Sequence, residues 1–408
     1  MSDGHESASP PAAATATIDW KAGFSRFRDA DPDQLHFAAH SHHYWPDVTF
    51  EAQQRVWLDA ARHVDRKWDA AVFGDVLPRL QQSIARALSL SDPRSLCFAP
   101  NTHELLVRLV SAFERPAGEP LRILSSDGEF HSFERQTRRW EEAGQVTVER
   151  VPLEPFATFP KRFLERARAF GGELCYLSHV FFGSGYVFPA LSELAEALPA
   201  ETMMVVDGYH SWMALPVDWS GLEQRAFYLS GGYKYAMAGE GCCFAHCPPG
   251  YAERPVNTGW YAAFGDLAKP RGGGHEVPYA RDGMRLFGAT FDPSGLYRQL
   301  AVLDWLHDLG ATVEDVHRHV VVLQQQLLDA VEQERAGSLR LDQLVPDRSL
   351  SERGHFLTFQ RADAAALHRG LAERGVVTDV RGERIRFGFG VYQDGGDVEA
   401  LVERLGGL

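Results

Sequence analysis

Short apolar runs alternate with amphipathic stretches along most of the chain from about residue 95 onward. The apolar runs have the length and composition of buried strands, and they span residues 96–99, 122–126, 147–152, 174–180, 203–207, 226–229 and 242–247. Helical patterns lie between them, for example at residues 104–113 and 191–198. This alternation predicts βαβ units and an α/β fold with a doubly wound, mostly parallel sheet.

The pattern changes after residue 296. A long helical stretch, at residues 296–309 and 313–333, leads to a strand–helix–strand region that ends at Leu408. We expect a smaller α+β domain there. The predicted organisation is a loose tail over residues 1–17, a segment joining the small domain over 18–60, a large ligand-binding domain over 61–295 and the small C-terminal domain over 296–408.

Composition and charge exclude several classes of protein. The 408 residues are 45% hydrophobic and 24% charged, which excludes a disordered or collagen-like chain. No run approaches the roughly 18 apolar residues of a membrane span, and the first residues lack the pattern of a signal peptide, so we expect a soluble, cytoplasmic protein without a membrane partner. The net charge of −14 argues against a nucleic-acid partner.

The five cysteines could suggest a zinc site, because three of them lie close together. They are Cys97, Cys175, Cys242, Cys243 and Cys247. No Cys-x-x-Cys pair is present, and Cys242 and Cys243 alternate across a strand-like run. We therefore expect reduced core cysteines and no metal.

Candidate chemistry gathers where the predicted strands end. In an open α/β sheet, ligands bind outside the carboxyl ends of the strands. The polar segments at those positions are 101–103, 129–131, 178–179, 207–210 and 230–234. Neither a Gly-x-Gly-x-x-Gly after an early strand nor a Gly-x4-Gly-Lys-Ser/Thr is present, which disfavours nicotinamide and P-loop sites.

Two of these strand ends carry an acid and a lysine. Asp207 ends one predicted strand, and Lys234 follows the next strand after Gly231 and Gly232. A lysine in a cleft can form a Schiff base with a carbonyl cofactor, and a nearby acid can keep a pyridine nitrogen protonated. The glycines allow the backbone to approach a bound group closely. The alternative without a cofactor is that Lys234 is an exposed surface lysine and Asp207 an aspartate in a turn.

Longer motifs resemble a known family. Tyr233-Lys-Tyr-x-x-Ala-Gly-x-Gly, preceded by Asp207-x-x-His, resembles the pyridoxal-phosphate lysine region of kynureninase, a member of the class V aminotransferase superfamily (fold type I). Further ordered similarities occur at residues 128–133, 177–185, 259–260 and 374–386. The resemblance covers most of residues 35–408 and implies pyridoxal phosphate in the large domain, an amino-acid substrate and a homodimer.

The resemblance also implies roles for individual residues. Lys234 would form the Schiff base, Asp207 would pair with the pyridine nitrogen, and Tyr233 would contact the cofactor and shuttle a proton. The other cofactor contacts would be Phe130 stacking on the ring, His210 and Ser178 beside it, Asn101, Thr102 and His103 at the phosphate, and Trp260 and Thr290 near the phosphate from the other subunit. Several of these residues have a simpler structural explanation, such as a core Phe for Phe130 or an ordinary helix N-cap for Asn101.

Substrate recognition is expected from two further segments. Arg386 would bind the substrate α-carboxylate with two parallel hydrogen bonds, with Arg381 as the second choice. An exposed charge on an edge strand is the alternative for Arg386. By its position in the resemblance, the segment containing His40, Ser41 and His42 would surround the substrate side chain.

The leading functional prediction is a hydrolase that cleaves the Cβ–Cγ bond of kynurenine, in tryptophan catabolism, or of a related aromatic γ-keto amino acid, releasing alanine and an aromatic acid. The alternatives are another class V enzyme (an aminotransferase, epimerase or β-eliminating lyase) and a non-enzymatic scaffold. The sequence departs from the kynureninase pattern at residues 40–43, at Phe133 and at residues 387–392. A cysteine desulfurase is the least favoured, because residues 248–408 contain no cysteine.

Overall fold

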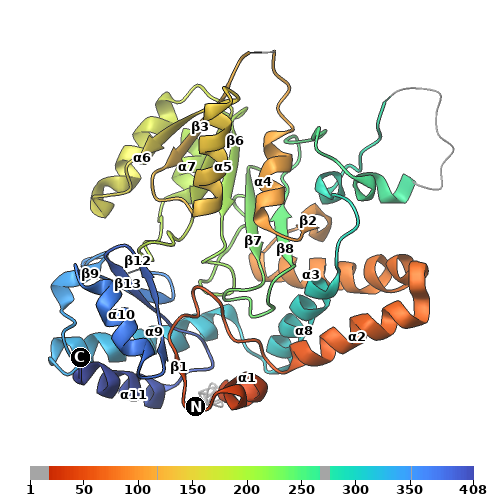
Figure 1. Cartoon of the computed structure of the whole chain (residues 1–408). Helices are drawn as coiled ribbons and strands as arrows, with labels where there is room; N and C mark the ends of the chain where they lie inside the picture. Colours follow the sequence, from red (N-terminus) through yellow and green to blue (C-terminus); the bar gives the residue numbers. More distant parts are fainter. Residues whose placement is uncertain (1–17, 117, 267–275, 351) are drawn as a thin grey trace, which may run out of the picture.

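A seven-stranded sheet forms the centre of the protein (Figure 1). This computed structural model describes residues 18–116, 118–266, 276–350 and 352–408, so the predicted loose tail at 1–17 lies outside the described residues. The strand order is β2-β8-β7-β6-β5-β3-β4, with bounds β2 Leu96–Ala99, β3 Leu121–Ser126, β4 Val146–Val151, β5 Leu174–Ser178, β6 Met203–Asp207, β7 Ala226–Gly231 and β8 Cys243–His246. Among the described strands of this sheet, β8 pairs antiparallel with both β2 and β7 and the remaining pairings are parallel, which confirms the predicted mostly parallel arrangement.

The predicted strands match the observed ones closely because nearly all their residues are buried. Strands β2 and β6 have the predicted bounds, and the others differ by one to two residues at their ends. All residues of β2, β5, β7 and β8 are buried, as expected for strands covered on both faces.

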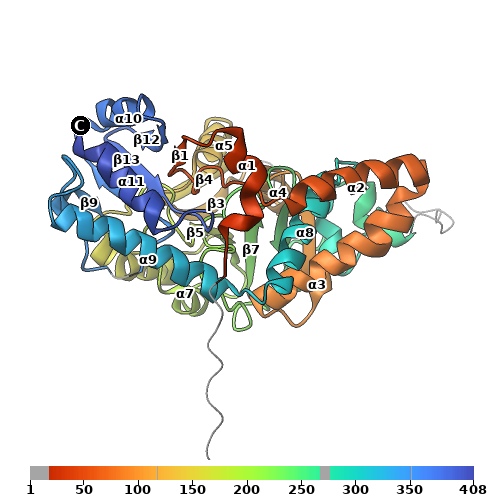
Figure 2. The same cartoon turned by 90° about the horizontal axis from the view of Figure 1, so that it is seen from below.

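Helices cover both faces of the sheet. Figure 2 shows α5 on one side of the strands and α7 on the other, as right-handed crossovers between parallel strands require. The helices of this part are α1 Ser25–Ala30, α2 Val48–His63, α3 Leu77–Leu88, α4 Thr102–Val110, α5 His131–Glu142, α6 Phe159–Ala169, α7 Leu191–Ala197 and α8 Ser294–Asp308. A π-helical segment, Trp68–Val76, leads from the α2 region into α3.

A smaller α+β region follows along the chain (blue in Figure 1). Its antiparallel sheet has the order β12-β13-β10-β9, and its elements are α9 Val313–Glu332, β9 Leu344–Val345, β10 Phe356–Gln360, α10 Ala364–Ala372, β11 Val376–Val377, β12 Asp379–Arg381, β13 Arg384–Gly388 and α11 Gly395–Gly406. The fold prediction, an α/β body with a smaller C-terminal α+β part, is therefore confirmed.

The N-terminal segment is tied to this smaller region. Strand β1 (Leu35–His36) pairs in parallel with β11, and Phe37 is fully buried in the hydrophobic core of the smaller region. Helix α8, in contrast, packs its buried residues into the core of the large sheet. The predicted domain boundaries at residues 60 and 295 stay predictions. Among the described residues, no helix is both long and apolar enough to span a membrane.

We expect Phe37→Ala to destabilise the fold by about 3–5 kcal/mol, the usual cost of removing a buried phenylalanine ring. Phe37 is fully buried and packs edge-on against Phe389, with ring centroids 5.5 Å apart. The matched control is Phe50→Ala, because Phe50 is 45% exposed; its cost should stay below about 1 kcal/mol. Equilibrium denaturation measures both. Equal costs would contradict the packing described here.

Candidate active site

A cavity of about 220 Å³ lies at the carboxyl ends of the parallel strands, and we call it the Lys234 pocket. The ends of β6 and β7 contribute Asp207, His210, Tyr233 and Lys234 to its wall. The ends of β2, β3 and β5 contribute Asn101, Thr102, His103, Phe130 and Ser178. The structure thus brings these predicted cofactor residues together, while their roles stay predictions.

Lys234 is buried with only 5% of its surface exposed. Its Nζ donates a hydrogen bond to Nε2 of His210 at 2.8 Å, and it lies 4.7 Å from the ring centre of Tyr209 and 5.3 Å from that of Phe130. Burial lowers the pKa of Lys234 to about 7, although the charge of Asp207 partly offsets this effect. A substantial fraction of the amine is therefore neutral near pH 7.

His210 is neutral in this arrangement. Burial, and then the positive charge of Lys234, hold its pKa well below the usual value. A neutral imidazole that accepts at Nε2 carries its proton on Nδ1. Among the described residues, that Nδ1 has no hydrogen-bond partner although it is buried. His210 thus has an unused polar atom beside the pocket.

The Asp207 carboxylate is fixed by the protein from two sides. Its Oδ1 accepts a hydrogen bond from the Tyr209 backbone N–H at 2.9 Å, and its Oδ2 accepts one from the Tyr176 hydroxyl at 2.9 Å. The motifs did not point to Tyr176. The signal that could have found it is its place in β5, two residues before Ser178 and therefore on the same face of the sheet.

Helix α4 begins at the pocket. Asn101 caps the helix by accepting the Glu104 backbone N–H at 2.9 Å, and Thr102 and His103 form its first turn. The free N–H groups and the dipole of a helix N-terminus favour an anion. Asn101 is therefore a helix N-cap, which was the simpler explanation for this residue, and it also lines the Lys234 pocket.

A buried carboxyl group, that of Glu129, is in contact with Ser178. It accepts hydrogen bonds from the Ser126 hydroxyl at 2.6 Å, the Ser178 hydroxyl at 2.5 Å and the Ser178 backbone N–H at 3.0 Å. Burial raises the pKa of Glu129 to about 8. Glu129 directly precedes Phe130 in the sequence, but the motifs gave it no role. It fixes the position of Ser178 at the pocket wall.

Arg386 does not line the Lys234 pocket. It is buried on β13, forms an ion pair with Asp379 and donates a hydrogen bond to the backbone carbonyl of Phe182. Phe182 does line the pocket. The predicted carboxylate-binding arginine therefore contacts a residue of the pocket wall, Phe182, without lining the pocket itself. Asp379 is a partner that sequence reasoning gave no role.

The predicted substrate-binding segment at residues 40–42 is buried at one end and exposed at the other. His40 is fully buried, stacks on Phe356 with centroids 4.7 Å apart, and has its Nε2 3.8 Å from the Asp379 carboxylate. Neither ring nitrogen of His40 has a hydrogen-bond partner among the described residues. His42 is exposed and stacks on Tyr233 at 5.0 Å, with the Ser41 hydroxyl 3.3 Å from its Nδ1.

Trp260 and Thr290 lie away from the Lys234 pocket in the single chain. Trp260 is 41% exposed, and its indole N–H donates to the Thr290 hydroxyl at 3.1 Å. Neither residue is part of the pocket wall. Their assignment to the phosphate region was made for a partner subunit, so it stays a prediction.

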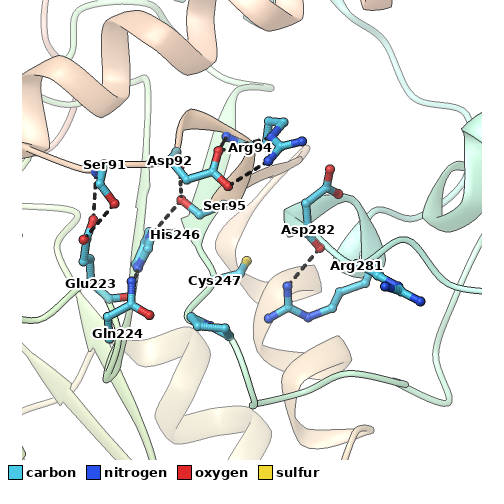
Figure 3. A pocket seen from close by; sticks show the side chains of 12 residues that line it. Ser91, Asp92, Arg94, Ser95, Glu223, Gln224, His246, Cys247, Arg281 and Asp282 are labelled. Atoms are coloured by element: carbon cyan, nitrogen blue, oxygen red, sulfur yellow. Dashed lines mark hydrogen bonds and ion pairs between the residues drawn. The ribbon is translucent and has the colours of Figure 1, made fainter.

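A second cavity, of about 400 Å³, lies at the other edge of the sheet, beside the start of β2 and the end of β8 (Figure 3). Its polar side chains largely bind one another: Asp92 pairs with Arg94, Glu223 accepts from Ser91, and Ser95 contacts His246. Its lining contains no lysine. The chemistry therefore favours the Lys234 pocket as the candidate active site.

Two sequence comparisons found matches to known proteins. Residues 316–405 match the family described as kynureninase C-terminal domain. The chain is also 28% identical over 362 residues to isopenicillin N epimerase of Streptomyces clavuligerus, a similarity that covers 82% of this chain and 84% of the epimerase.

Solved structures share the fold. A mutant of C-DES with glycine covalently linked to its PLP cofactor has a TM-score of 0.75 at 18% identity, covering 96% of this chain and 99% of that one. A cysteine desulfurase from Thermococcus onnurineus NA1 has a TM-score of 0.73 at 16% identity, covering 92% and 96%. At these identities the likeness concerns the fold alone. The chain has the architecture of pyridoxal-phosphate-dependent enzymes of fold type I, and the sequence matches support the predicted resemblance to the class V superfamily.

Proposed function

We propose that this chain is a pyridoxal-phosphate-dependent enzyme that removes and returns the α-proton of an amino-acid substrate. The observation that carries the proposal is the buried Lys234 amine, hydrogen-bonded to neutral His210 in a pocket that also contains the Asp207 carboxylate. Burial that lowers a lysine pKa to about 7 is what a lysine needs to act as a nucleophile and base at neutral pH.

The residues of the pocket fit the cofactor. Lys234 would hold its aldehyde carbon, Asp207 its ring nitrogen, and the first turn of α4 at Thr102 and His103 its phosphate. The unpartnered Nδ1 of His210 offers a further polar contact. When bound, pyridoxal phosphate supplies an electron-withdrawing ring that stabilises negative charge at the substrate Cα.

The chain's own groups supply the proton transfers. Lys234 takes the proton from Cα, and its low pKa keeps the amine ready to accept it near neutral pH. Burial raises the pKa of Tyr233 to about 12, so its hydroxyl stays protonated and can donate. Arg386 binds the α-carboxylate, which requires the Phe182 carbonyl to leave its guanidinium.

Epimerisation at Cα is the reaction that the similarities favour. The similarity to isopenicillin N epimerase extends over 82% of this chain and so includes the Lys234 region, whereas the kynureninase family match is confined to residues 316–405. Proton removal and return by Lys234 and Tyr233 complete an epimerisation without a further reactant.

Hydrolysis of kynurenine or a related aromatic γ-keto amino acid is the second candidate. Its specific support is the family match at 316–405, which contains Arg386 and its partner Asp379. The departures at residues 40–43 and Phe133 lie where the kynureninase pattern would recognise its substrate and cofactor. They count against this second candidate.

A homodimer would complete the site. Helix α2 exposes Trp57 and Leu58 to 69% and 57%, and Trp260 is also exposed, so apolar surface is present for a second copy. In such a dimer, Trp260 and Thr290 would reach the phosphate of the partner's cofactor.

Lys234→Ala should abolish catalysis. We expect exchange of the substrate α-proton with deuterated water to slow by roughly 10³-fold or more, since the base is lost. Borohydride should also no longer attach pyridoxal phosphate covalently at position 234, since alanine has no amine. Lys161→Ala, at an exposed lysine with 82% side-chain exposure, is the matched control and should exchange at nearly the wild-type rate. Wild-type exchange in Lys234→Ala would disprove the role of this lysine.

Covalent capture of pyridoxal phosphate by the apo-protein should follow the titration of Lys234. Only the neutral amine attacks a carbonyl, and the pKa of Lys234 lies near 7, so borohydride-trapped product at this residue should rise through about pH 7. Peptide mass spectrometry of samples trapped between about pH 5.5 and 9 gives the profile. A midpoint above about pH 9 would contradict the lowered pKa.

Two assays distinguish the reactions. Incubation with amino acids of both configurations, followed by chiral chromatography, should show interconversion and α-deuteration if the enzyme is an epimerase. Incubation with kynurenine and 3-hydroxykynurenine should then release no alanine or fluorescent anthranilate. Alanine and anthranilate release without interconversion would instead establish the second candidate.

A further inference from the structure

A buried phenol contacts the Asp207 carboxylate, which lines the Lys234 pocket. Tyr176 is 4% exposed, and its hydroxyl donates to Asp207 Oδ2 at 2.9 Å. Burial, and then the charge of Asp207, hold the pKa of Tyr176 well above the usual value, so the phenol remains a donor. Tyr176 itself does not line the Lys234 pocket. It can act on the site only through Asp207.

Phe133 holds the Tyr176 ring in place. The two rings stack with centroids 4.1 Å apart and planes inclined by 13°, and Phe133 is 2% exposed. Phe133 thus serves as an apolar platform that orients the Tyr176 hydroxyl.

The two donors on Asp207 have a common consequence. With one oxygen held by the Tyr209 N–H and the other by Tyr176, the carboxylate cannot rotate freely. A negative charge held in a fixed position beside a ring nitrogen favours the protonated form of that nitrogen.

We propose that Tyr176, oriented by Phe133, is a positioning residue that fixes Asp207 and keeps the shared proton on the ring nitrogen of bound pyridoxal phosphate. This inference rests on the proposed function. A residue outside the pocket wall would then control how strongly the bound ring withdraws electrons.

Tyr176→Phe tests the proposal, because it removes one hydroxyl and preserves the stacked ring. With pyridoxal phosphate labelled with ¹⁵N in the ring, the nitrogen resonance of the holo-protein should move toward that of an unprotonated pyridine. The affinity of the apo-protein for pyridoxal phosphate, followed by tryptophan fluorescence, should fall roughly tenfold, as loss of a hydrogen bond to a charged group predicts. The rate constant for α-proton exchange should fall more than KM changes.

Tyr228→Phe is the matched control. Tyr228 is a fully buried phenol on the neighbouring strand β7, and its hydroxyl contacts Ser211 at 2.9 Å rather than Asp207. Removal of this hydroxyl should leave the ¹⁵N resonance of bound pyridoxal phosphate unchanged. A second variant, Phe133→Leu, keeps Tyr176 but removes its platform, and should shift the resonance in the same direction by a smaller amount.

The outcomes separate the inference from the proposed function. In one outcome the wild-type protein binds pyridoxal phosphate, and the Tyr176→Phe and Phe133→Leu variants, shown to be folded by thermal unfolding, have the wild-type resonance and affinity. That outcome disproves the role of Tyr176 and leaves the proposed function standing. A wild-type protein that binds no pyridoxal phosphate overturns the proposed function, and this inference with it.

Discussion

The burial of one amine is the constraint on which the candidate site depends. Lys234 lies in the protein interior, its Nζ is hydrogen-bonded to a neutral imidazole, and aromatic rings surround it. Water no longer stabilises the ammonium there, so the pKa falls to about 7. A reactive amine at neutral pH is thus a consequence of packing. The surrounding sheet must be rigid enough to keep this charge-bearing group away from solvent.

The sheet also fixes two carboxyl groups, Asp207 and Glu129, and among the described residues neither forms an ion pair with a cationic side chain. Asp207 is held by Tyr176 and a backbone N–H, and Glu129 is held by Ser126 and Ser178. Hydroxyl donors fix the direction of a carboxylate without neutralising it, so Asp207 remains available to a cationic ring nitrogen. The parallel pairing of β5 with β6, which sets Ser178 opposite Asp207, brings these groups together.

Recognition of the substrate is assigned to a different part of the molecule. Arg386 comes from the C-terminal sheet, and its contact with Phe182 connects that sheet to the pocket wall. His40 comes from the N-terminal segment and lies near the Asp379 carboxylate, which itself pairs with Arg386. In the proposed function, proton transfer and carboxylate binding are therefore carried by elements that are far apart in the sequence and meet at Phe182.

The alternation of apolar and amphipathic segments was enough to predict the strands, the mostly parallel sheet and the strand ends that form the pocket, because fully buried strands leave a strong pattern. The motifs around Asp207 and Lys234 predicted pyridoxal phosphate and a resemblance to the class V superfamily, which the comparisons support, while kynurenine as substrate remains one of two proposals. Only the tertiary structure showed the burial of Lys234 that lowers its pKa, the hydrogen bond from Tyr176 to Asp207, and the contact of Arg386 with Phe182 at the pocket wall. These depend on burial and on contacts between residues distant in the chain, such as Arg386 and Phe182, for which a linear pattern carries no signal.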